Sequence, residues 1–576
     1  MARASRTPRR PARAAGDAER GFVLVWFAIL LVVLLGFAAL AVDVWHWNHE
    51  GARMQRAADA AALGGAVFMP ENPGQIAYTT AKQITAKNGY ANGVSGVQID
   101  TRPGLRPNQL KVTVSKPVKN FFGSVLGIGS TTIVKHAVAE YERSVNMGSP
   151  INQFGNDPEL GTIVHGSTRY PDFWANVFGP RSSKAKGDAV LATLCGSGTD
   201  NCSGSTNVDH DPMGYFYGVE VAPGAVGSLA VQAFDPAFAH VGDNCGNNNG
   251  GSNLIGASQL PPNFNPSFPV ANPSVRYDPA SSSVYCSGDM YYADGTDNGI
   301  PPWTVYQVRE PDDTPNDPTN NPVVCQVEFP GHTGNLVPSL QSTTAPAGAP
   351  DLFVRYFRQW FTICTVANPQ SGTYFVQVQT KTKLNGDAAP YGGGANRFAL
   401  RAGLGGNFTS TNLRIFGEAR IGIYANAPSA NTTFYLARVL PGARGRSLVV
   451  TFFDTGDAAQ AGALTVLPPP DATTTNGAPL TSWAGCTYTA PPGTSSGPPF
   501  GTFTATQANC RINGVSSANY NGQWVQVKVP IPDDYDCTFT DATGCWARIN
   551  FAFPANVNDT TTWVARIEGD PVRLVE

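Results

Sequence analysis

The chain has 576 residues, a formal net charge of −3 and 14% charged residues. This balance excludes the strongly basic surface expected of a nucleic-acid-binding protein. Glycine (61 residues) and proline (46 residues) are abundant while aromatic residues reach 10%, which predicts short strands joined by turn-rich loops and excludes a disordered chain.

A single apolar segment near the N-terminus predicts a membrane anchor. Residues 21–42 carry no charged side chain and as a helix would span about 33 Å, enough for a hydrocarbon core of about 30 Å. Residues 1–20 form a basic tail with six arginines, so the positive-inside rule places this tail in the cytoplasm and the bulk of the chain outside the cytoplasmic membrane. A cleaved signal peptide, cut near Ala38, Ala39 and Ala41, is the alternative, although its apolar core would be shorter.

The helix is expected to continue outside the membrane to about Phe68. The sequence after residue 42 is rich in alanine, methionine, glutamine and arginine, which favour helix. Trp45 and Trp47 stand where aromatic residues belong at the membrane interface. Pro70 then stops the helix.

Three features of this region occur in a fixed order: Glu19-Arg20-Gly21 before the apolar segment, Asp43 after it, and a run from Gln55 to Ala66. Together they resemble the N-terminal region of the TadE/TadG-like proteins of Flp (tight adherence) pilus assembly. The resemblance implies a membrane-anchored accessory role in pilus biogenesis, with pilus-assembly membrane proteins as partners. Trp26 stands where pilin-like precursors usually carry glutamate, which argues against processing after Gly21. The D-x-S-x-S motif of members with a von Willebrand A domain is missing.

The centre of the matching run consists mainly of small residues, and it includes the polar residues Gln55 and Asp59 before and after the first two alanines. It comprises Gln55, Ala57, Ala58, Asp59, Ala60, Ala61, Ala62 and Leu63. Small side chains permit close approach of helices, so we expect an interface on this face. Asp59 is expected either to pair with a cation of a partner or to face solvent.

Residues 43–146 predict a small α+β unit that is continuous with the anchor helix. A second helix ends at Asn88-Gly89, and strands are expected over 94–101, 109–115 and 131–142. A short amphipathic helix is expected before the last strand. Its apolar residues Phe121, Phe122, Val125 and Leu126 are predicted to face inward.

The pattern changes to β structure from about residue 147. Residues 215–235 and 433–454 both contain an aromatic strand, a Pro-Gly-Ala turn, an apolar strand and a terminal Phe-Asp. Each copy predicts a hairpin. Because a lone hairpin cannot bury its apolar face, we expect two tandem β-sandwich (jelly-roll-like) domains, 147–405 with long loops and 406–576. The aspartates that end the copies, Asp235 and Asp454, are expected to cap turns or to bind a ligand.

All ten cysteines lie in this β-rich part: Cys195, Cys202, Cys245, Cys286, Cys325, Cys364, Cys486, Cys510, Cys537 and Cys545. An even number confined to one region predicts disulfides formed in an oxidising compartment. Proximity along the chain favours the five consecutive pairs. Metal binding by thiolates is the alternative, but the chain has no C-x-x-C motif.

Familiar catalytic motifs such as H-E-x-x-H and the P-loop are missing from the chain, so we expect no enzyme. His46 and His49 are spaced to share a helix face and bind a metal, although a place at the membrane interface explains them as well. Oxygen-rich loops offer ligands for calcium, and solvated turns explain them equally. These loops contain Asp243, Asn244, residues 247–249, Asp289, Asp294, Asp297, Glu310, Asp312, Asp313 and Asp317. No other cofactor is expected.

The expected function is therefore that of a structural or accessory protein in Flp-type pilus assembly. A surface adhesin or ligand-binding protein without a pilus role is the alternative, and it predicts an exposed aromatic patch from Trp303, Trp360 or Tyr291-Tyr292. A secreted hydrolase is a third hypothesis, which requires two carboxylates close together in a cleft.

Overall fold

The computed structural model describes residues 17–575 with the exception of several internal segments. These segments are 70–74, 105–108, 142–143, 156–171, 236–301, 312–317, 330–359, 382–392, 410–411, 428–429, 475, 490–501, 504–509, 541–542, 556 and 569–571. The chain forms two compact units. Unit 1 comprises Met1–Tyr141 with Val572–Glu576, and unit 2 comprises Glu142–Pro571.

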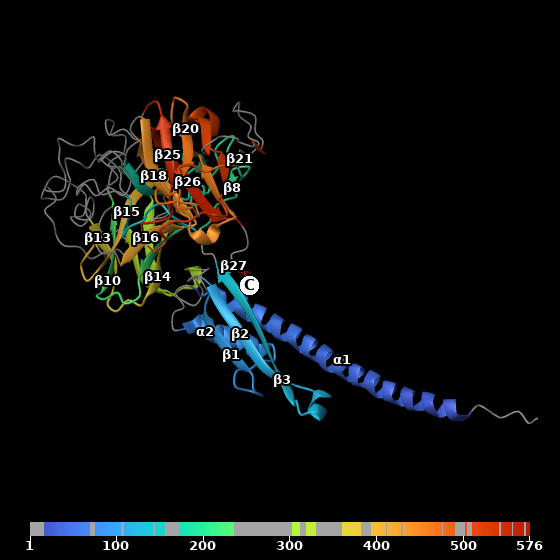
Figure 1. The fold of residues 1–576 in the computed structure, drawn as a ribbon. Helices are drawn as coiled ribbons and strands as arrows, with labels where there is room; N and C mark the ends of the chain where they lie inside the picture. Colours follow the sequence, from blue (N-terminus) through green and yellow to red (C-terminus); the bar gives the residue numbers. More distant parts are fainter. Residues whose placement is uncertain are drawn as a thin grey trace, which may run out of the picture. The chain divides into compact units, whose positions relative to one another are not determined.

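Unit 1 has two layers, in which two helices cover one face of an antiparallel sheet with the order β1-β2-β3-β27 (Figure 1). Its elements are α1 (Asp17–Ala66), α2 (Ile76–Lys87), β1 (Gln98–Pro103), β2 (Gln109–Lys119), the short 3-10 helix η2 (Gly123–Leu126), β3 (Ser130–Tyr141) and β27 (Val572–Leu574). The alternating residues Leu110, Val112 and Val114 of β2 share one core with Met54 of α1 and Ala81 of α2. The prediction of an α+β unit continuous with a long N-terminal helix is confirmed.

The strand β27 joins unit 1 although it follows unit 2 in the chain. Val572 pairs with Tyr141 and Leu574 pairs with Ala139. The prediction that residues 406–576 belong entirely to the second sandwich is wrong at this end. The physical reason is that β3 offers an edge with unpaired backbone groups, which β27 covers.

Unit 2 consists of two large antiparallel sheets around one core. The first sheet runs β13 (Trp360–Val366), β10 (Leu229–Phe234), β15 (Ala395–Leu404), β6 (Asp172–Phe178), β17 (Arg420–Ala427), β26 (Val557–Ile567), β19 (Ser447–Phe453), β24 (Trp524–Pro530), β21 (Thr487–Thr489) and β22 (Thr502–Phe503), with β5 (Gln153–Phe154) beside β15. The second runs β12 (Val323–Phe329), β11 (Trp303–Arg309), β14 (Gly372–Lys381), β9 (Tyr215–Val221), β16 (Leu413–Glu418), β4 (Asn146–Met147), β18 (Ala430–Arg438), β25 (Trp546–Phe553), β20 (Gly462–Leu467) and β23 (Arg511–Val515). Short elements are β7 (Cys202–Ser203), β8 (Thr206–Asn207), α6 (Ser517–Tyr520), η3 (Lys184–Lys186), η6 (Pro318–Asn320) and η7 (Pro441–Ala443).

Each half of unit 2 has the strand order of a jelly roll. In the first half, β13-β10-β15-β6 lies in one sheet and β12-β11-β14-β9 in the other. Numbered along the chain, these strands have the orders 6-3-8-1 and 5-4-7-2, as in a jelly roll. The second half repeats both orders in β24-β19-β26-β17 and β23-β20-β25-β18, with β21 and β22 inserted. The predicted fold of jelly-roll-like sandwiches is confirmed, and residues 405 and 406 lie between β15 and β16.

The two sandwiches are joined, because both large sheets of unit 2 run through the two halves. In the first sheet, β6 pairs with β17, so that Trp174 lies opposite Tyr424. In the second sheet the halves exchange a strand: β16 pairs with β9 of the first half, and β4 pairs with β18 of the second half. This pairing covers strand edges that would be open in isolated sandwiches.

The two copies of the sequence repeat connect the sheets and are not hairpins. β9 and β18 lie in the second sheet, whereas the strands that follow them, β10 and β19, lie in the first. The hairpin prediction is wrong because a Pro-Gly turn reverses the chain without deciding whether the flanking strands pair. Both strands of a copy bury apolar side chains, such as Tyr217 and Val231, in the same core, and therefore pack face to face.

Candidate functional site

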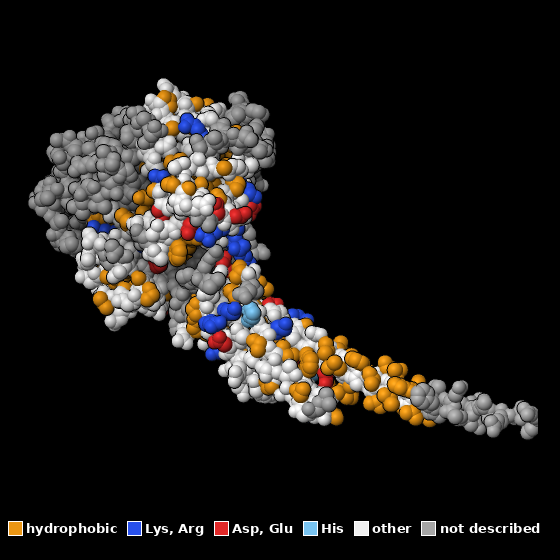
Figure 2. All heavy atoms as spheres, viewed as in Figure 1, with side chains coloured by type: hydrophobic (Ala, Val, Ile, Leu, Met, Phe, Trp, Pro, Cys, Tyr) orange, Lys and Arg blue, Asp and Glu red, His pale blue; other side chains and the backbone are white. Residues whose placement is uncertain are grey.

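The N-terminal part of α1 has the properties of a membrane span. Of the helices in the described chain, α1 is the one long and apolar enough to cross a membrane. Its large apolar side chains between Leu24 and Val42 are exposed; Leu24, for example, is 70% exposed. Figure 2 shows this part of α1 with a largely apolar surface. Such a surface is unfavourable in water and favourable in lipid.

The small residues of the TadE/TadG-like run lie against unit 1 itself. Ala57, Ala58, Ala61 and Ala62 are at most 1% exposed and belong to the core that α1 forms with α2 and the sheet. The interface expected on this face exists, but it is filled from within the chain.

The polar residues of the run support the same packing. The Nε2 atom of Gln55 donates hydrogen bonds to Asp59 Oδ1 and to the carbonyl oxygen of His136 on β3, both at 2.8 Å. Asp59 is half-buried and accepts a hydrogen bond from Gln55, so its carboxylate is neither fully exposed to solvent nor without a hydrogen-bond partner within unit 1. Ala60 and Leu63 are also half-buried, and Leu63 packs at the edge of the core.

Two glycines set the closest approach of α1 to its neighbours. A Cβ atom on Gly64 would lie 2.3 Å from Cδ1 of Ile84, and one on Gly65 would lie 2.4 Å from Cδ2 of Leu110. At Gly64 the end of the Ile84 side chain could turn away from a Cβ atom. At Gly65 a Cβ atom would also lie 2.8 Å from the backbone carbonyl oxygen of Ala77, so the space there fits only glycine. The helix therefore passes through both glycines and ends at Ala66.

Asp43 joins α1 to the loop between β2 and β3. Its carboxylate accepts hydrogen bonds from the backbone N–H groups of Phe121 (2.8 Å), Phe122 (3.1 Å) and Gly123 (2.7 Å). Asp43 is only 2% exposed, and these donors compensate for its burial. The sequence marked Asp43 as part of the family pattern but did not reveal its partners, which lie far along the chain.

Glu50 forms a second link about two turns further along α1. It accepts a hydrogen bond from Lys116 Nζ at 2.6 Å and another from the hydroxyl of Tyr90 at 3.2 Å. Burial raises the pKa of Glu50, but Lys116 and its other partners outweigh this effect and leave the pKa below its usual value. Burial and the charge of Glu50 raise the pKa of Tyr90 to about 12. At neutral pH Glu50 is thus ionised, while the Tyr90 hydroxyl keeps the proton that it donates to Glu50.

The cysteines of unit 2 form disulfides wherever both partners are described. The pairs are Cys195–Cys202, Cys325–Cys364, Cys486–Cys510 and Cys537–Cys545, with Cα–Cα distances of 6.0, 5.6, 5.3 and 5.3 Å. These are pairs that proximity in the sequence favours. Cys245 and Cys286 lie outside the described residues.

The candidate metal ligands are not brought together in the part of the chain that the structure describes. The ring of His46 lies 4.9 Å from that of Phe121, and His49 stacks on Trp45 at 5.4 Å. Among the described residues no group of three His, Cys, Asp or Glu side chains is placed to hold a metal. Of the oxygen-rich loop residues, Glu310 alone is described. Calcium binding by the others stays a prediction.

The aromatic residues considered for an adhesive patch do not form one where they are described. Trp303 and Trp360 are 3% and 7% exposed and belong to the interior of unit 2. Tyr291-Tyr292 lies outside the described residues.

Two neighbouring aspartates are buried in the second half of unit 2: Asp454, which follows the repeat strand β19, and Asp559, which lies in β26. Asp454 accepts a hydrogen bond from the backbone N–H of Gly522, as expected of a cap, and its counterpart Asp235 is also buried. Asp559 of β26 accepts a hydrogen bond from the N–H of Gly456 at 3.0 Å. Burial raises the pKa of Asp559 to about 7 and holds that of Asp454 well above its usual value, an effect to which the neighbouring Asp559 contributes.

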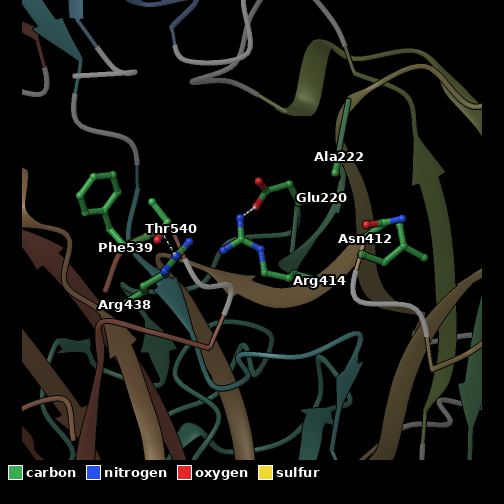
Figure 3. A pocket seen from close by; sticks show the side chains of 8 residues that line it. Glu220, Ala222, Asn412, Arg414, Arg438, Phe539 and Thr540 are labelled. Atoms are coloured by element: carbon green, nitrogen blue, oxygen red, sulfur yellow. Dashed lines mark hydrogen bonds and ion pairs between the residues drawn. The ribbon is translucent and has the colours of Figure 1, made fainter. Parts of the chain in front are cut away.

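A pocket lies in unit 2 where β9, β16 and β18 come together (Figure 3). Glu220 and Arg414 form an ion pair in its wall. Arg438 donates hydrogen bonds to the carbonyl oxygens of Gly544 (3.2 Å) and Phe539 (3.1 Å). Glu220 and Arg438 occupy the same position in the two repeat copies, so the pocket marks the junction of the two halves. Its charges are engaged within unit 2, and we assign no ligand to it.

Comparison with known proteins agrees with the resemblance at the N-terminus. The profile of the Flp pilus-assembly TadE/G-like family matches residues 21–67. No curated protein and no solved structure matches the chain. The matched segment coincides with the apolar part of α1 and the residues that pack it into unit 1. The N-terminal segment is therefore TadE/G-like.

Proposed function

We propose that this chain is a membrane-anchored accessory protein of Flp-type pilus assembly, with its bulk outside the cytoplasmic membrane. The observation that carries the proposal is the coincidence of the family match with α1. The matched residues 21–67 include the segment that is long and apolar enough to cross a membrane and the residues that enter the core of unit 1. The six arginines of the N-terminal tail favour a cytoplasmic N-terminus.

The junction between anchor and unit 1 supports an assembly role. α1 continues from the apolar segment into unit 1 without a break, and it is tied to β2 and the following loop through Asp43 and Glu50. A helix held in this way passes the orientation of its membrane segment directly to the attached unit. Membrane proteins of the Flp assembly machinery that contact the anchor would therefore also position unit 1.

Unit 2 then serves as an outward-facing scaffold or binding module and not as an enzyme. Its disulfides suit an oxidising compartment. In the described chain the buried aspartates Asp188, Asp454 and Asp559 cap backbone N–H groups, and they do not line the pocket beside Arg414. The proposed partners are the cytoplasmic membrane and pilus-assembly membrane proteins, with no cofactor.

The test uses strains whose surface pili are counted by electron microscopy. One strain lacks the gene, and two others carry either the full chain or a chain in which residues 144–571 are replaced by a short flexible linker. The linker variant keeps residues 572–576 because β27 completes the sheet of unit 1. The proposal expects pili to disappear in the deletion strain and to return with the full chain.

Return of pili with the linker variant would assign the assembly role to unit 1 and make unit 2 a peripheral module. Normal pili in the deletion strain would overturn the accessory role. The jelly rolls would then be studied as the binding modules of an independent surface protein.

A further inference from the structure

We propose that the tip of the hairpin between β2 and β3, residues 120–129, enters the membrane interface beside α1 and forms a second contact with lipid. The proposal rests on membrane anchoring by α1, which is part of the proposed function, but not on a role in pilus assembly.

The contacts between the hairpin and α1 show that the tip points toward the membrane segment. Along β2 and into the loop, successive residues contact successively earlier residues of α1. The contacts are Lys116 Nζ to Glu50 Oε1 (2.6 Å), Trp47 Nε1 to Asn120 Oδ1 (2.9 Å) and Phe121 N to Asp43 Oδ1 (2.8 Å). β2 therefore runs antiparallel to α1, and its end reaches Asp43, the first residue after the apolar segment 21–42. Figure 1 shows the hairpin extending along α1.

The backbone at the tip is prepared for an apolar environment. The N–H groups of Phe121, Phe122 and Gly123 all donate to the carboxylate of Asp43. The N–H of Asn120 donates to Gly129 O, and that of Ile128 donates to Gly123 O. A loop can approach hydrocarbon only if its backbone donors are satisfied within the protein, and these five donors are.

The side chains of the tip are apolar and point away from the core of unit 1. Phe121 is 60% exposed, Phe122 47%, Val125 83% and Ile128 57%. The amphipathic pattern predicted that Phe121, Phe122 and Val125 face inward, and this prediction is wrong. The physical reason is that the backbone N–H groups of residues 121–123 face inward to donate hydrogen bonds to Asp43, so the side chains face outward.

The neighbouring surface identifies lipid as the occupant. On α1, Val44 and Trp45 beside Asp43 are also exposed, by 39% and 66%, so the apolar surface of the membrane segment continues around the junction. Aromatic residues such as Trp45 favour the headgroup region. Lys119, at the end of β2, is exposed and suits the phosphates of anionic lipids. Continuity with the membrane segment favours a lipid contact over a contact with a second protein.

The experiment places a nitroxide spin label in the full chain, reconstituted into vesicles of zwitterionic and anionic phosphatidyl lipids. Three single-cysteine additions are compared: Val125→Cys at the tip, Leu34→Cys within the membrane segment, and Val226→Cys in unit 2, where the side chain is as exposed as that of Val125, at 83%. Collision of each label with oxygen, which concentrates in lipid, is compared with collision with a water-soluble nickel chelate. The unsubstituted chain reports background labelling.

We expect the ratio of oxygen to nickel collisions at residue 125 to rise above that at residue 226 and to fall short of that at residue 34. Equal ratios at residues 125 and 226 would place the tip in water and overturn the proposal. Protection of residue 125 from both reagents would also overturn it, because it would indicate a protein partner. A water-like ratio at residue 34 would instead contradict membrane anchoring and thus the proposed function.

A second substitution tests the hold of Asp43 on the loop. With Asp43→Ala, we expect the spectrum of the label at residue 125 to show faster motion and its oxygen preference to fall. An unchanged spectrum and depth would show that the tip is not positioned by this carboxylate.

Discussion

At the scale of single residues, glycine and buried acids fix the geometry of both units. Gly64 and Gly65 allow α1 to lie directly on α2 and β2. Asp43 holds three backbone donors of a loop, and Asp559 holds the N–H of Gly456. The glycines leave room for neighbouring groups that a side chain would displace. The aspartates supply the acceptors that these backbone N–H groups need.

Substitution Gly65→Ala tests the close approach of α1 to the sheet. The new Cβ would lie 2.4 Å from Cδ2 of Leu110 and 2.8 Å from the carbonyl oxygen of Ala77. We expect the free energy of unfolding of unit 1 to fall by about 1–3 kcal/mol, as for overpacked cores. The measurement is thermal unfolding of the full chain in detergent. Gly36→Ala is the matched control, since nothing lies within 4 Å of its Cβ; equal melting of both variants would contradict the packing argument.

Asp559 makes unit 2 sensitive to pH. Burial raises its pKa to about 7 from the ordinary 3.8, so between about pH 4 and pH 7 the folded chain holds a proton that the unfolded chain has released. The free energy of unfolding should therefore fall as pH rises through this window, by a few kcal/mol in order of magnitude. Asp559→Asn should reduce the dependence and leave the part that buried Asp454 contributes, and the exposed Asp533→Asn should not reduce it. Denaturant unfolding at pH 4.5 and pH 8 measures both; the same slope in Asp559→Asn and the unsubstituted chain would refute the assignment.

At the scale of elements, the strand β27 is the least expected feature of unit 1. Besides its pairing with β3, Arg573 forms an ion pair with Glu140 at 3.1 Å, and Glu140 is only 1% exposed. Gln109 donates to the same carboxylate at 2.8 Å. The strand thus supplies hydrogen bonds to an edge and a partner to a buried charge.

Ending the chain after Pro571 should loosen the edge of β3. We expect the amide protons of Val138 and Glu140, whose N–H groups face β27, to exchange faster with solvent, because the pairing strand is gone. Arg573→Ala should give a smaller effect that arises from Glu140 alone. Hydrogen exchange followed by mass spectrometry compares the three chains. Unchanged protection of residues 138–140 in the shortened chain would show that β27 adds nothing to the sheet.

At the scale of the whole molecule, unit 2 contains two jelly rolls that share sheets and exchange strands. Without β16 the first half would lose the neighbour of β9, and without β4 the second half would lose a neighbour of β18. The central pair of β6 and β17 would also be broken. Because its strand edges would be unpaired, we expect neither half to be stable as an isolated domain.

Separate expression of residues 144–409 and 412–571 in an oxidising compartment tests this dependence. We expect neither piece to give a cooperative unfolding transition alone, and the two together to form an equimolar complex with one. Size-exclusion chromatography and circular dichroism provide the readouts. Two independently folded monomers would contradict the shared-sheet architecture.

The sequence predicted the helices and strands of this chain better than it predicted which strands pair with each other. The apolar run, the alternation along β2 and the Pro-Gly turns are local signals, and each yielded a helix, a strand or a reversal where it was expected. The pairing of β4 with β18, and of β27 with β3, depends on edges that are distant in sequence and leave no local trace. The outward orientation of Phe121 was missed for the same reason, since Asp43 acts on it across the fold.

The position of β27 also has a consequence for the order of events during synthesis. Because β27 follows unit 2 in the chain while its partner β3 precedes unit 2, the sheet of unit 1 cannot be completed until all of unit 2 has left the ribosome. If the N-terminus is cytoplasmic, unit 2 must also have been exported by then. The sheet of unit 1 is thus complete only in chains whose jelly rolls have been fully translated and translocated. A chain that ends within the jelly rolls keeps the edge of β3 unpaired.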